Sequence, residues 1–399
     1  MMKRMKFNIN PSLIDGEENT QNVHNPVMQF VRNFFSHFDL LQVIPALILI
    51  TAGILFIYGT GEQAGYGAGL FWKRQFCYAI ASICIWLFLT FFDYRWLAPA
   101  SIPCYIISLI LLIIVLFWGP KVNNANRWLD FGGFSVQPSE IAKLALILIL
   151  SWLLSLKGVN INKPLWSLVY FLLVAVPFFL IYKEPDLGSA MVLFPVAAAI
   201  AFVANLKLRY VVIVLAAICI LMPLSYHYFM RPYQKERIQT FLDPDRDMGW
   251  NARQAEFAVG SGGIAGKGFM NGTHCLLGYL PKRVANSDFI FPVISEETGF
   301  LGALALITLY GCLLFSIFRT ALLAPDSFGR YLCTGIGTVI AVHTIVNMGM
   351  SIRLVPITGL PLPFVSYGGT FLVTVMIYCG IVQSIYAHRS RETFLTTSE

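Results

Sequence analysis

Long apolar segments, separated by short polar ones, set the pattern of this chain. Ten of them, each about 16 to 22 residues long, carry few charges, and an α-helix needs roughly 20 such residues to cross the hydrocarbon layer of a membrane. They cover residues 40–58, 75–92, 97–118, 141–156, 164–182, 187–204, 210–229, 298–318, 331–350 and 366–387. The pattern therefore predicts an all-α polytopic membrane protein with ten transmembrane helices.

The polar segments divide the chain into three regions. Residues 1–37 are polar and aperiodic, as in a disordered tail, and Val27 to Phe38 are amphipathic enough to lie along a membrane surface. Residues 38–390 form the membrane domain, and residues 391–399 form a second short tail. The one long polar stretch within the domain, residues 230–296, is predicted to be an extracytoplasmic loop between the seventh and eighth helices.

Composition agrees with a membrane protein and narrows its function. Hydrophobic residues make up 57% of the chain and charged residues 12%, about half of the ~25% typical of soluble domains. The eight cysteines are scattered without a C-x-x-C pair, so we interpret them as small apolar residues of the core and not as a metal or disulfide framework.

Two classes of nucleic-acid or nucleotide binding are not supported. No basic face on a folded polar domain is visible, so nucleic-acid binding is not expected. A Walker loop also fails, because Ser261 and Gly268 stand where Gly and Ser or Thr are required.

The distribution of Lys and Arg predicts the orientation of the chain. An even number of helices puts both termini on one side of the membrane, and thirteen Lys and Arg residues lie on that side. The opposite side has seven when the eight in the long loop are set aside. Because short cytoplasmic loops are enriched in these residues, we expect both termini in the cytoplasm.

The seven remaining outer cations stand mostly at helix ends, where the orientation rule disfavours them. Together with the eight cations of the long loop, they indicate an anionic ligand on the outer face. For any single one of them, snorkelling to lipid phosphates is the alternative. The seven are Lys73, Arg74, Lys121, Arg127, Lys143, Lys183 and Arg353.

Carboxylates also gather at the outer helix boundaries, where they are costly unless they are paired or functional. Some would pair with the cations, and residues 183–186 (KEPD) could form ion pairs among themselves. Glu296 and Glu297 could instead simply start a helix, since the positive end of the helix dipole favours carboxylates. The five outward candidates are Glu140, Glu184, Asp186, Asp288 and Glu297.

Asp288 differs from the other carboxylates in its neighbours. It precedes the predicted helix and is followed by Phe289, Ile290 and Phe291. Apolar surroundings raise the pKa of a carboxyl group, and a general base that works near neutral pH needs such a raised pKa. Asp288 is therefore the candidate base.

Two irregular segments complete the outer face. Glycines between residues 260 and 272 allow the backbone to approach a ligand or another helix closely. Residues 347–369 contain three prolines in a non-helical stretch, and irregular backbone at membrane depth is tolerated only against protein or a cavity. We expect this segment to form a wall of the site.

Seven short motifs, in order along ten predicted spans, resemble the SEDS (shape, elongation, division, sporulation) family over about residues 40–390. Within the family, VGSGGIAGKGFMNGTH (residues 259–274) is more similar to RodA, the elongation member, than to FtsW, the division member. The motifs are WKRQ (72–75), NANRWL (124–129), QPSEIAKL (137–144), KEPDLGSA (183–190), RIQTFLDP (237–244), SDFIF with SEETGFLG (287–302) and PITGLPLPFVSYGG (356–369).

The resemblance implies a peptidoglycan glycosyltransferase that polymerises lipid II on the outer leaflet of the bacterial inner membrane, for cell-wall elongation and cell shape. It implies a class B penicillin-binding transpeptidase and elongation-complex membrane proteins as partners. The essential aspartate of the family corresponds to Asp288, while its conserved acidic and basic pair corresponds to Glu140 and Lys143. A cofactor is not required by any ligand cluster in the sequence, although a divalent cation, Mg²⁺ or Mn²⁺, could share the work.

The expected substrate-binding residues come from these motifs and from the outer charges. They are Lys73, Arg74, Arg127, Trp128, Glu140, Lys143, Lys183, Glu184, Asp186, Arg237, Lys267, Glu297 and Ser366.

One motif departs from the family. Members have Pro-Glu and then His-Thr before the aspartate, whereas this chain has PKRVANSD, with Lys282 for the acid and Asn286 for the histidine. If the missing residues hold a metal or the acceptor, Lys282 or Arg283 would take over a phosphate contact.

Two rival functions follow from the same charges. A transporter that flips the lipid-linked precursor would line a path with ionisable residues in mid-membrane, but such residues are almost absent. We interpret His343, the one deep in a late helix, as a packed histidine. A purely structural scaffold would leave the fifteen outer cations unexplained.

Overall fold

The computed structural model describes residues 38–64, 69–122, 125–130, 132, 135–207, 209–210, 230, 232–243, 250–280 and 282–389. In these ranges the long helices are α2 (Leu40–Ala64), α3 (Gly69–Phe91), α4 (Leu97–Trp118), α5 (Pro138–Ser155), α6 (Pro164–Lys183), α7 (Leu187–Val203), α13 (Ile290–Leu323), α14 (Ser327–Ser351) and α15 (Gly369–Ala387). Eight are long and apolar enough to cross a membrane, and α7 is a shorter apolar helix. The multi-pass helical architecture is confirmed.

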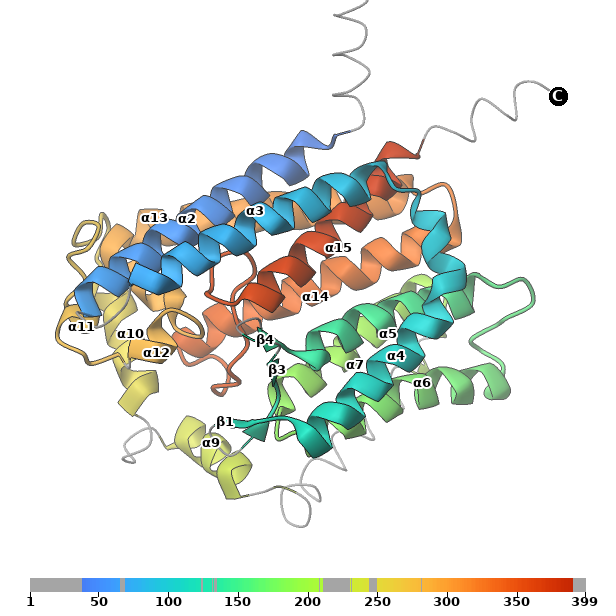
Figure 1. The fold of residues 1–399 in the computed structure, drawn as a ribbon, viewed down its shortest axis with the longest axis horizontal. Coiled ribbons are helices and arrows are strands. Elements are labelled where there is room, and N and C mark those ends of the chain that lie inside the picture. The colour runs from blue at the N-terminus through green and yellow to red at the C-terminus, as the bar shows by residue number, and fades with distance from the viewer. Residues whose placement is uncertain are drawn as a thin grey trace, which may run out of the picture. The chain divides into compact units, whose positions relative to one another are not determined.

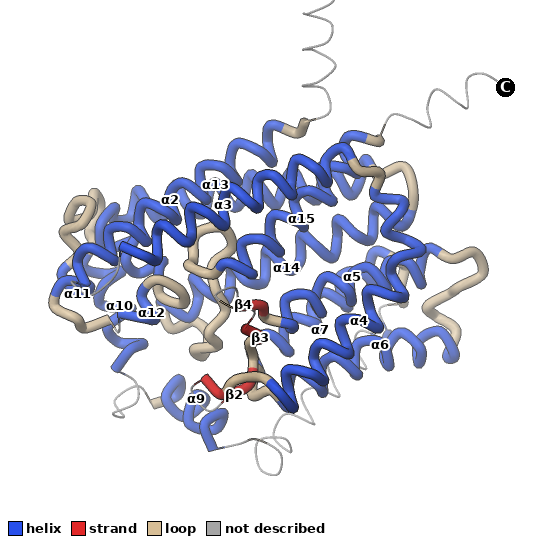
Figure 2. The backbone as a smooth tube through the Cα atoms, in the orientation of Figure 1, coloured by secondary structure: helices blue, strands red, loops and turns tan. Residues whose placement is uncertain are grey.

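The remaining elements are short and lie between the long helices. Two antiparallel pairs of two-residue strands follow α4 (Figure 2). They are β1 (Lys121–Val122) with β2 (Ala125–Asn126), and β3 (Leu129–Asp130) with β4 (Ser135–Val136). Four short helices precede α13, namely α9 (Pro232–Leu242), α10 (Trp250–Ser261), α11 (Thr273–Leu276) and α12 (Lys282–Ala285). The stretch 230–296 is therefore largely helical where it is described.

Some predicted boundaries and segments need comment. Helix α13 begins at Ile290 and is divided by the break at Gly299, and its second part begins where the eighth helix was predicted. The part before the break was not predicted as helix; it starts with Ile290 and Phe291, which are buried. The predicted helix at 210–229 lies outside the described residues except for Tyr210, as do the tails at 1–37 and 391–399. The exact count of ten helices thus stays a prediction.

The long helices form two groups that α14 joins (Figure 1). Helices α2, α3, α13 and α15 pack together, and α4, α5, α6 and α7 form the second group. Helix α14 contacts α13 on one side and α5 and α7 on the other. The helices differ in how far the protein buries them. In α5 and α15, 78% of the most apolar segment is buried inside the protein, whereas in α6 only 22% is. Helix α6 therefore lies at the edge of the bundle.

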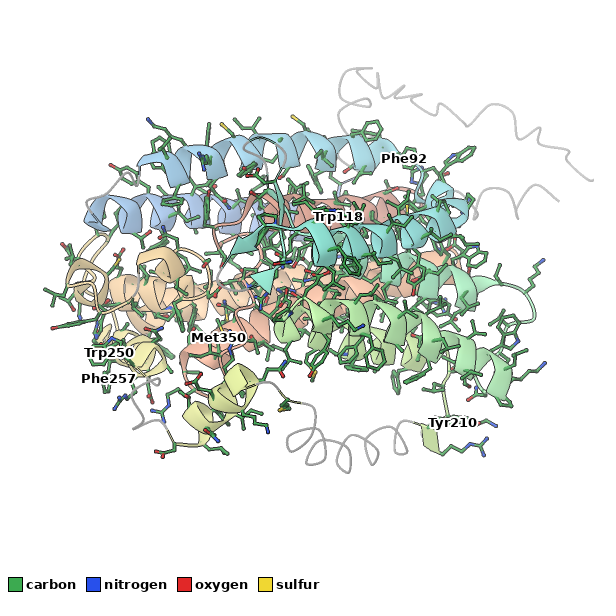
Figure 3. All side chains as sticks on the ribbon, turned by 60° about the horizontal axis from the view of Figure 1, so that its bottom comes forward. Phe92, Trp118, Tyr210, Trp250, Phe257 and Met350 are labelled. Atoms are coloured by element: carbon green, nitrogen blue, oxygen red, sulfur yellow. The ribbon has the colours of Figure 1, made fainter. Side chains whose placement is uncertain are left out.

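Helix α2 begins and α15 ends at the same end of the bundle (Figure 1). Gln42 near the start of α2 donates a hydrogen bond to the carbonyl of Cys379 in α15 at 2.9 Å. Trp250 and Phe257 on α10 lie at the opposite end from Phe92 and Tyr210 (Figure 3). We call the end that carries α9 to α12 the loop end.

A glycine contact bends α13 at the loop end. Gly299 has φ 69° and interrupts the helix, and a Cβ atom there would lie 2.3 Å from the backbone nitrogen of Gly266. Gly266 itself has φ 79°, and a Cβ atom there would lie 2.2 Å from the carbonyl of Glu297. The predicted close approach of the glycine-rich segment to another helix is therefore confirmed.

Candidate active site

Asp288 lies in a turn between α12 and α13, and we call residues Asn286–Phe289 the Asp288 turn. The segment between α14 and α15, residues Ile352–Gly368, packs on it and is called the bridge. The backbone nitrogen of Tyr367 donates to the carbonyl of Asn286 at 2.8 Å, and the Ser366 hydroxyl donates to the carbonyl of Ser287 at 2.5 Å. This irregular segment therefore packs directly on the turn that carries the candidate base, as a wall of the predicted site would.

The carboxyl group of Asp288 faces the bridge at Gly359, which has φ 77°. A Cβ atom at Gly359 would lie 3.4 Å from Asp288 Oδ2, an ordinary contact distance, so the carboxyl group lies directly against the bridge, and the positive φ favours a glycine here. Burial raises the pKa of Asp288 to about 6; the nearby negative charge of Asp186 adds to this effect. A hydrogen bond from Ser287 and the positive charges of Arg237 and Arg127 oppose it.

Arg237 and Arg127 approach this carboxyl group from two different elements. Arg237, on α9, donates from Nη1 to the carbonyl of Thr358 in the bridge at 3.2 Å. Arg127, between β2 and β3, donates through Nε to the carbonyl of Glu184 at 3.4 Å and through Nη2 to the carbonyl of Pro185. The fold thus brings residues from four distant motifs around Asp288.

The turn between α6 and α7 supplies two carboxyl groups with different environments. Asp186 caps α7 by accepting from the Ser189 backbone nitrogen at 3.2 Å, and Gln137 Nε2 donates to it at 3.1 Å. Within the described part of the chain, both carboxyl oxygens of Glu184 are buried without a hydrogen-bond partner. Burial and the neighbouring charge of Asp186 raise the pKa of Glu184 to about 9, although Arg127 opposes the shift. The alternative of an ion-pair knot within residues 183–186 is therefore wrong for Glu184.

Glu140 and Lys143 form a buried ion pair on the first turns of α5. Lys143 Nζ lies 2.7 Å from Glu140 Oε1 and 2.9 Å from His343 Nε2. His343 Nδ1 lies 3.2 Å from the carbonyl of Pro361 in the bridge. His343 is fully buried and stacks on Phe371, so the interpretation of a packed histidine holds, and its contact with Lys143 is a feature that the sequence did not indicate. The sequence signal was weak because α5 and α14 are 200 residues apart along the chain.

Lys267, Glu296 and Glu297 belong to a different cluster. Glu296 Oε1 lies 2.6 Å from Lys267 Nζ and 2.8 Å from His274 Nδ1, and it accepts from the Thr273 hydroxyl at 2.8 Å. Glu297 accepts from the backbone nitrogen of Met270 at 3.0 Å. Glu296 and Glu297 precede the break at Gly299, after which the second part of α13 begins, so their place agrees with the alternative that they stand at the start of a helix. Their carboxyl groups also hold the glycine-rich segment.

The other predicted binding residues surround the site less closely. Lys73 and Arg74 are exposed at the start of α3, where Lys73 Nζ lies 5.8 Å from the centre of the Trp72 ring and Arg74 is hydrogen-bonded to Tyr367. Trp128 is half-buried and Lys183 is exposed at the end of α6. Ser366 is buried, and its hydroxyl also accepts from the Leu362 backbone nitrogen at 2.8 Å, so it supports the bridge.

The residues that depart from the family motif have specific places. Asn286 is buried, and its side-chain oxygen accepts a hydrogen bond from the Thr60 hydroxyl of α2. It therefore fastens the Asp288 turn to the first helix of the bundle. The side chains of Lys282 and Arg283 lie outside the described part of the chain.

A cleft of about 220 Å³ opens beside Arg237. Helices α9 and α10 and the bridge line it, with Glu236, Arg237, Asn251, Arg353 and Ile357 among the lining residues. Arg353 is paired with Glu256 at 2.7 Å. Arg237 lines this cleft and also interacts electrostatically with Asp288, so it links the two.

The described side chains contain no group of three or more His, Cys, Asp or Glu residues arranged to hold a metal ion. Glu184, Asp186 and Asp288 interact electrostatically, but they do not converge on one point as a ready set of ligands. The residues therefore do not form a preorganised divalent-cation site by themselves.

The fold and the site together define a class of protein. It is a multi-pass helical membrane protein in which Asp288, a carboxyl group with a raised pKa, interacts electrostatically with Arg127 and Arg237. The chain belongs to the SEDS family, since the family model for FtsW, RodA and SpoVE, described as cell cycle protein, matches residues 32–391. This is a family of cell-wall glycosyltransferases, and the chain is an enzyme of this kind.

Individual relatives support this placement. The chain is 33% identical over 364 residues to a probable peptidoglycan glycosyltransferase FtsW of Trichlorobacter lovleyi, covering 88% of this chain and 94% of the relative. It is 37% identical over 295 residues to the peptidoglycan glycosyltransferase MrdB of Escherichia coli, covering 71% and 77%. A chain from a solved peptidoglycan synthase complex that coordinates polymerization and crosslinking superposes with a TM-score of 0.76 at 29% identity, covering 89% of this chain and 99% of that one.

Proposed function

We propose that this enzyme polymerises lipid II into glycan strands at the outer face of the bacterial inner membrane, and that it serves cell-wall elongation and cell shape. The observation that carries the proposal is the Asp288 carboxyl group, which faces Gly359 of the bridge and interacts electrostatically with Arg127 and Arg237; burial raises its pKa to about 6. A base of this strength is largely ionised at neutral pH and is still more basic than an ordinary aspartate.

In the proposed reaction, Asp288 accepts the proton of the acceptor 4-hydroxyl as its oxygen attacks the anomeric carbon of the donor. The bond from that carbon to the pyrophosphate oxygen breaks, and polyprenyl pyrophosphate leaves with the electron pair. Attack opposite to the leaving group inverts the anomeric centre from α to β. A positioned general base contributes about 10²- to 10⁴-fold to such a step.

Negative charge develops on the departing pyrophosphate, so fixed cations near the donor lower the barrier. Arg127 and Arg237 are the best-supported cations for this role, since both face Asp288. Arg74 and Lys183 remain proposed contacts at the rim of the site. Lys143 and Lys267 are already paired with Glu140 and Glu296, which argues that they organise the protein more than they bind the leaving group.

A divalent cation, Mg²⁺ or Mn²⁺, could neutralise the pyrophosphate. The described residues contain no group of three or more His, Cys, Asp or Glu side chains placed to hold such an ion. The proposed reaction therefore has no step at a metal. The residues that act are the base and the two arginines.

We propose that the loop end faces the periplasmic side and that both termini are cytoplasmic, in agreement with the distribution of Lys and Arg. The similar chain from a complex that coordinates polymerization and crosslinking supports a crosslinking partner, and a class B penicillin-binding transpeptidase fits this role. Further elongation-complex membrane proteins are expected neighbours.

The rival is a transporter that flips the lipid-linked precursor, and a direct comparison separates the two. Purified enzyme in vesicles receives labelled lipid II, and the products are analysed on a gel while the leaflet of the label is followed with a quencher. Glycan chains without a change of leaflet support the proposal. Movement of the label between leaflets without any polymer would contradict it.

A further inference from the structure

The Asp288 turn is held by a row of hydrogen bonds to three successive carbonyl groups. The carbonyl of Asn286 accepts from the Tyr367 backbone nitrogen at 2.8 Å, and that of Ser287 accepts from the Ser366 hydroxyl at 2.5 Å. The carbonyl of Asp288 itself accepts from Asn347 Nδ2 at 2.9 Å. Only the last donor comes from a transmembrane helix, since Asn347 lies on α14.

Asn347 makes a second contact that joins two parts of the site. The same Nδ2 donates to the carbonyl of Leu360 in the bridge at 2.7 Å. Leu360 follows Gly359, the residue that faces Asp288 Oδ2. One amide group thus fixes the backbone of the candidate base and the backbone of the wall that its carboxyl group faces.

The chemistry of the side chain fits a positioning role. Asn347 is completely buried on α14, and its Oδ1 has no hydrogen-bond partner among the described residues. Buried polar groups in proteins are usually hydrogen-bonded, and the Nδ2 group of Asn347 donates to two carbonyl groups. The side chain therefore acts as a hydrogen-bond donor at this position. Leucine or aspartate has a similar size at this position, but neither can donate.

We propose that Asn347 is a positioning residue for the glycosyl transfer: it clamps the Asp288 turn to the bridge and thereby sets where the base meets the acceptor hydroxyl. The inference rests on the proposed function of Asp288. A displacement of about 1 Å in a catalytic group can cost about 100-fold in rate, so a lost clamp should lower kcat without removing substrate contacts.

The test compares Asn347→Leu and Asn347→Asp with a control on the same helix. Thr344→Val also removes a buried hydrogen bond from α14, but the Thr344 hydroxyl bonds only to the carbonyl of Ile340 at 2.8 Å in its own helix. Each full-length variant is purified with its transpeptidase partner. Initial rates of lipid II polymerisation and thermal unfolding are then measured.

We expect both Asn347 variants to lose about 10- to 100-fold in kcat, with KM within about twofold of the wild-type value. Thr344→Val should retain wild-type kcat, and the unfolding temperatures of the three variants should be similar. The inference is overturned if Asn347→Leu keeps its kcat. It is also overturned if KM rises while kcat stays, or if kcat falls equally in Thr344→Val.

Asp288→Asn, measured in parallel, separates this inference from the proposed function. If Asp288→Asn is inactive and Asn347→Leu is fully active, only the positioning role fails. If Asp288→Asn is itself active, the assignment of the base fails, whatever Asn347 does.

Discussion

At the scale of single residues, Asp288 suits the role of general base because its surroundings make the ionised carboxylate less favourable but still accessible at neutral pH. Loss of water raises its pKa to about 6, while Arg237 and Arg127 keep the ionised form accessible. An ordinary exposed aspartate, with a pKa of about 3.9, would be a weaker base by about two units.

The rate of polymerisation should therefore fall as the pH drops through about 6, because the protonated base cannot accept a proton. The profile of kcat between pH 5 and 8 checks this. A flat profile down to pH 5, with the enzyme still folded, would speak against Asp288 as the base.

The same shift predicts a stability effect of opposite sign. The pKa of this carboxyl group is higher in the folded than in the unfolded protein, so ionisation is less favourable in the folded state. The free energy of unfolding therefore falls as the pH rises above the pKa of the unfolded state, and the loss is complete above about pH 6. Asp288→Asn removes this cost and should unfold at the same or a higher temperature than the wild type at pH 8. A lower unfolding temperature that is specific to pH 8 would contradict this account.

Glu184 offers a contrast at the same scale. Its pKa of about 9 and its unpartnered buried oxygens mean that it is neutral at pH 7. Glu184→Gln should keep the fold and retain activity within about threefold at pH 7, because the amide matches the neutral acid in shape and polarity. A loss of 100-fold or more would show that the ionised form is required.

At the scale of elements, the glycine-rich segment and α13 depend on Glu296. Removing one partner of a fully buried ion pair lowers the free energy of unfolding by about 3–5 kcal/mol. Lys267 keeps 28% of its side chain exposed, so Glu296→Ala should lower the free energy of unfolding by less, about 2–3 kcal/mol. The Glu256–Arg353 pair is a matched control, since it is 43% and 30% exposed, and Glu256→Gln should cost below about 1 kcal/mol. Equal losses in unfolding temperature for the two variants would contradict the special role of Glu296.

Element positions were largely predictable because membrane spans need long apolar runs, and the boundaries failed where apolar surface continued beyond the span. The part of α13 from Ile290 to the break at Gly299 was not predicted as helix, and Glu296 and Glu297 lie at its end. Partners that are distant along the chain were not predictable from spacing, unlike the Glu140–Lys143 pair on one helix. His274 lies 22 residues from Glu296, and His343 lies 200 residues from Lys143. Asn347 gave no signal in the sequence, because a single asparagine in an apolar helix shows its role only through the carbonyls that it meets.

At the scale of the whole molecule, α9, which carries Arg237, and α12, which precedes Asp288, lie at the loop end, away from the end where α2 begins and α15 ends (Figure 1). Orientation is therefore testable. Fluorescent-protein and alkaline-phosphatase fusions at the C-terminus should give fluorescence and no phosphatase activity, and a phosphatase inserted after Gly278 should be active. The reverse pattern would invert the proposed topology and exclude an outer-leaflet site.

The central claim is that Asp288 drives glycan polymerisation by this chain, and one gel tests it most directly. Purified wild-type enzyme and Asp288→Asn, each with the transpeptidase partner, are incubated with labelled lipid II at pH 7.5, and the products are separated by length. The account predicts a ladder of glycan chains for the wild type and at most about 1% of that product for Asp288→Asn, in line with the ~10²- to 10⁴-fold worth of a general base. An equal ladder from Asp288→Asn would contradict it.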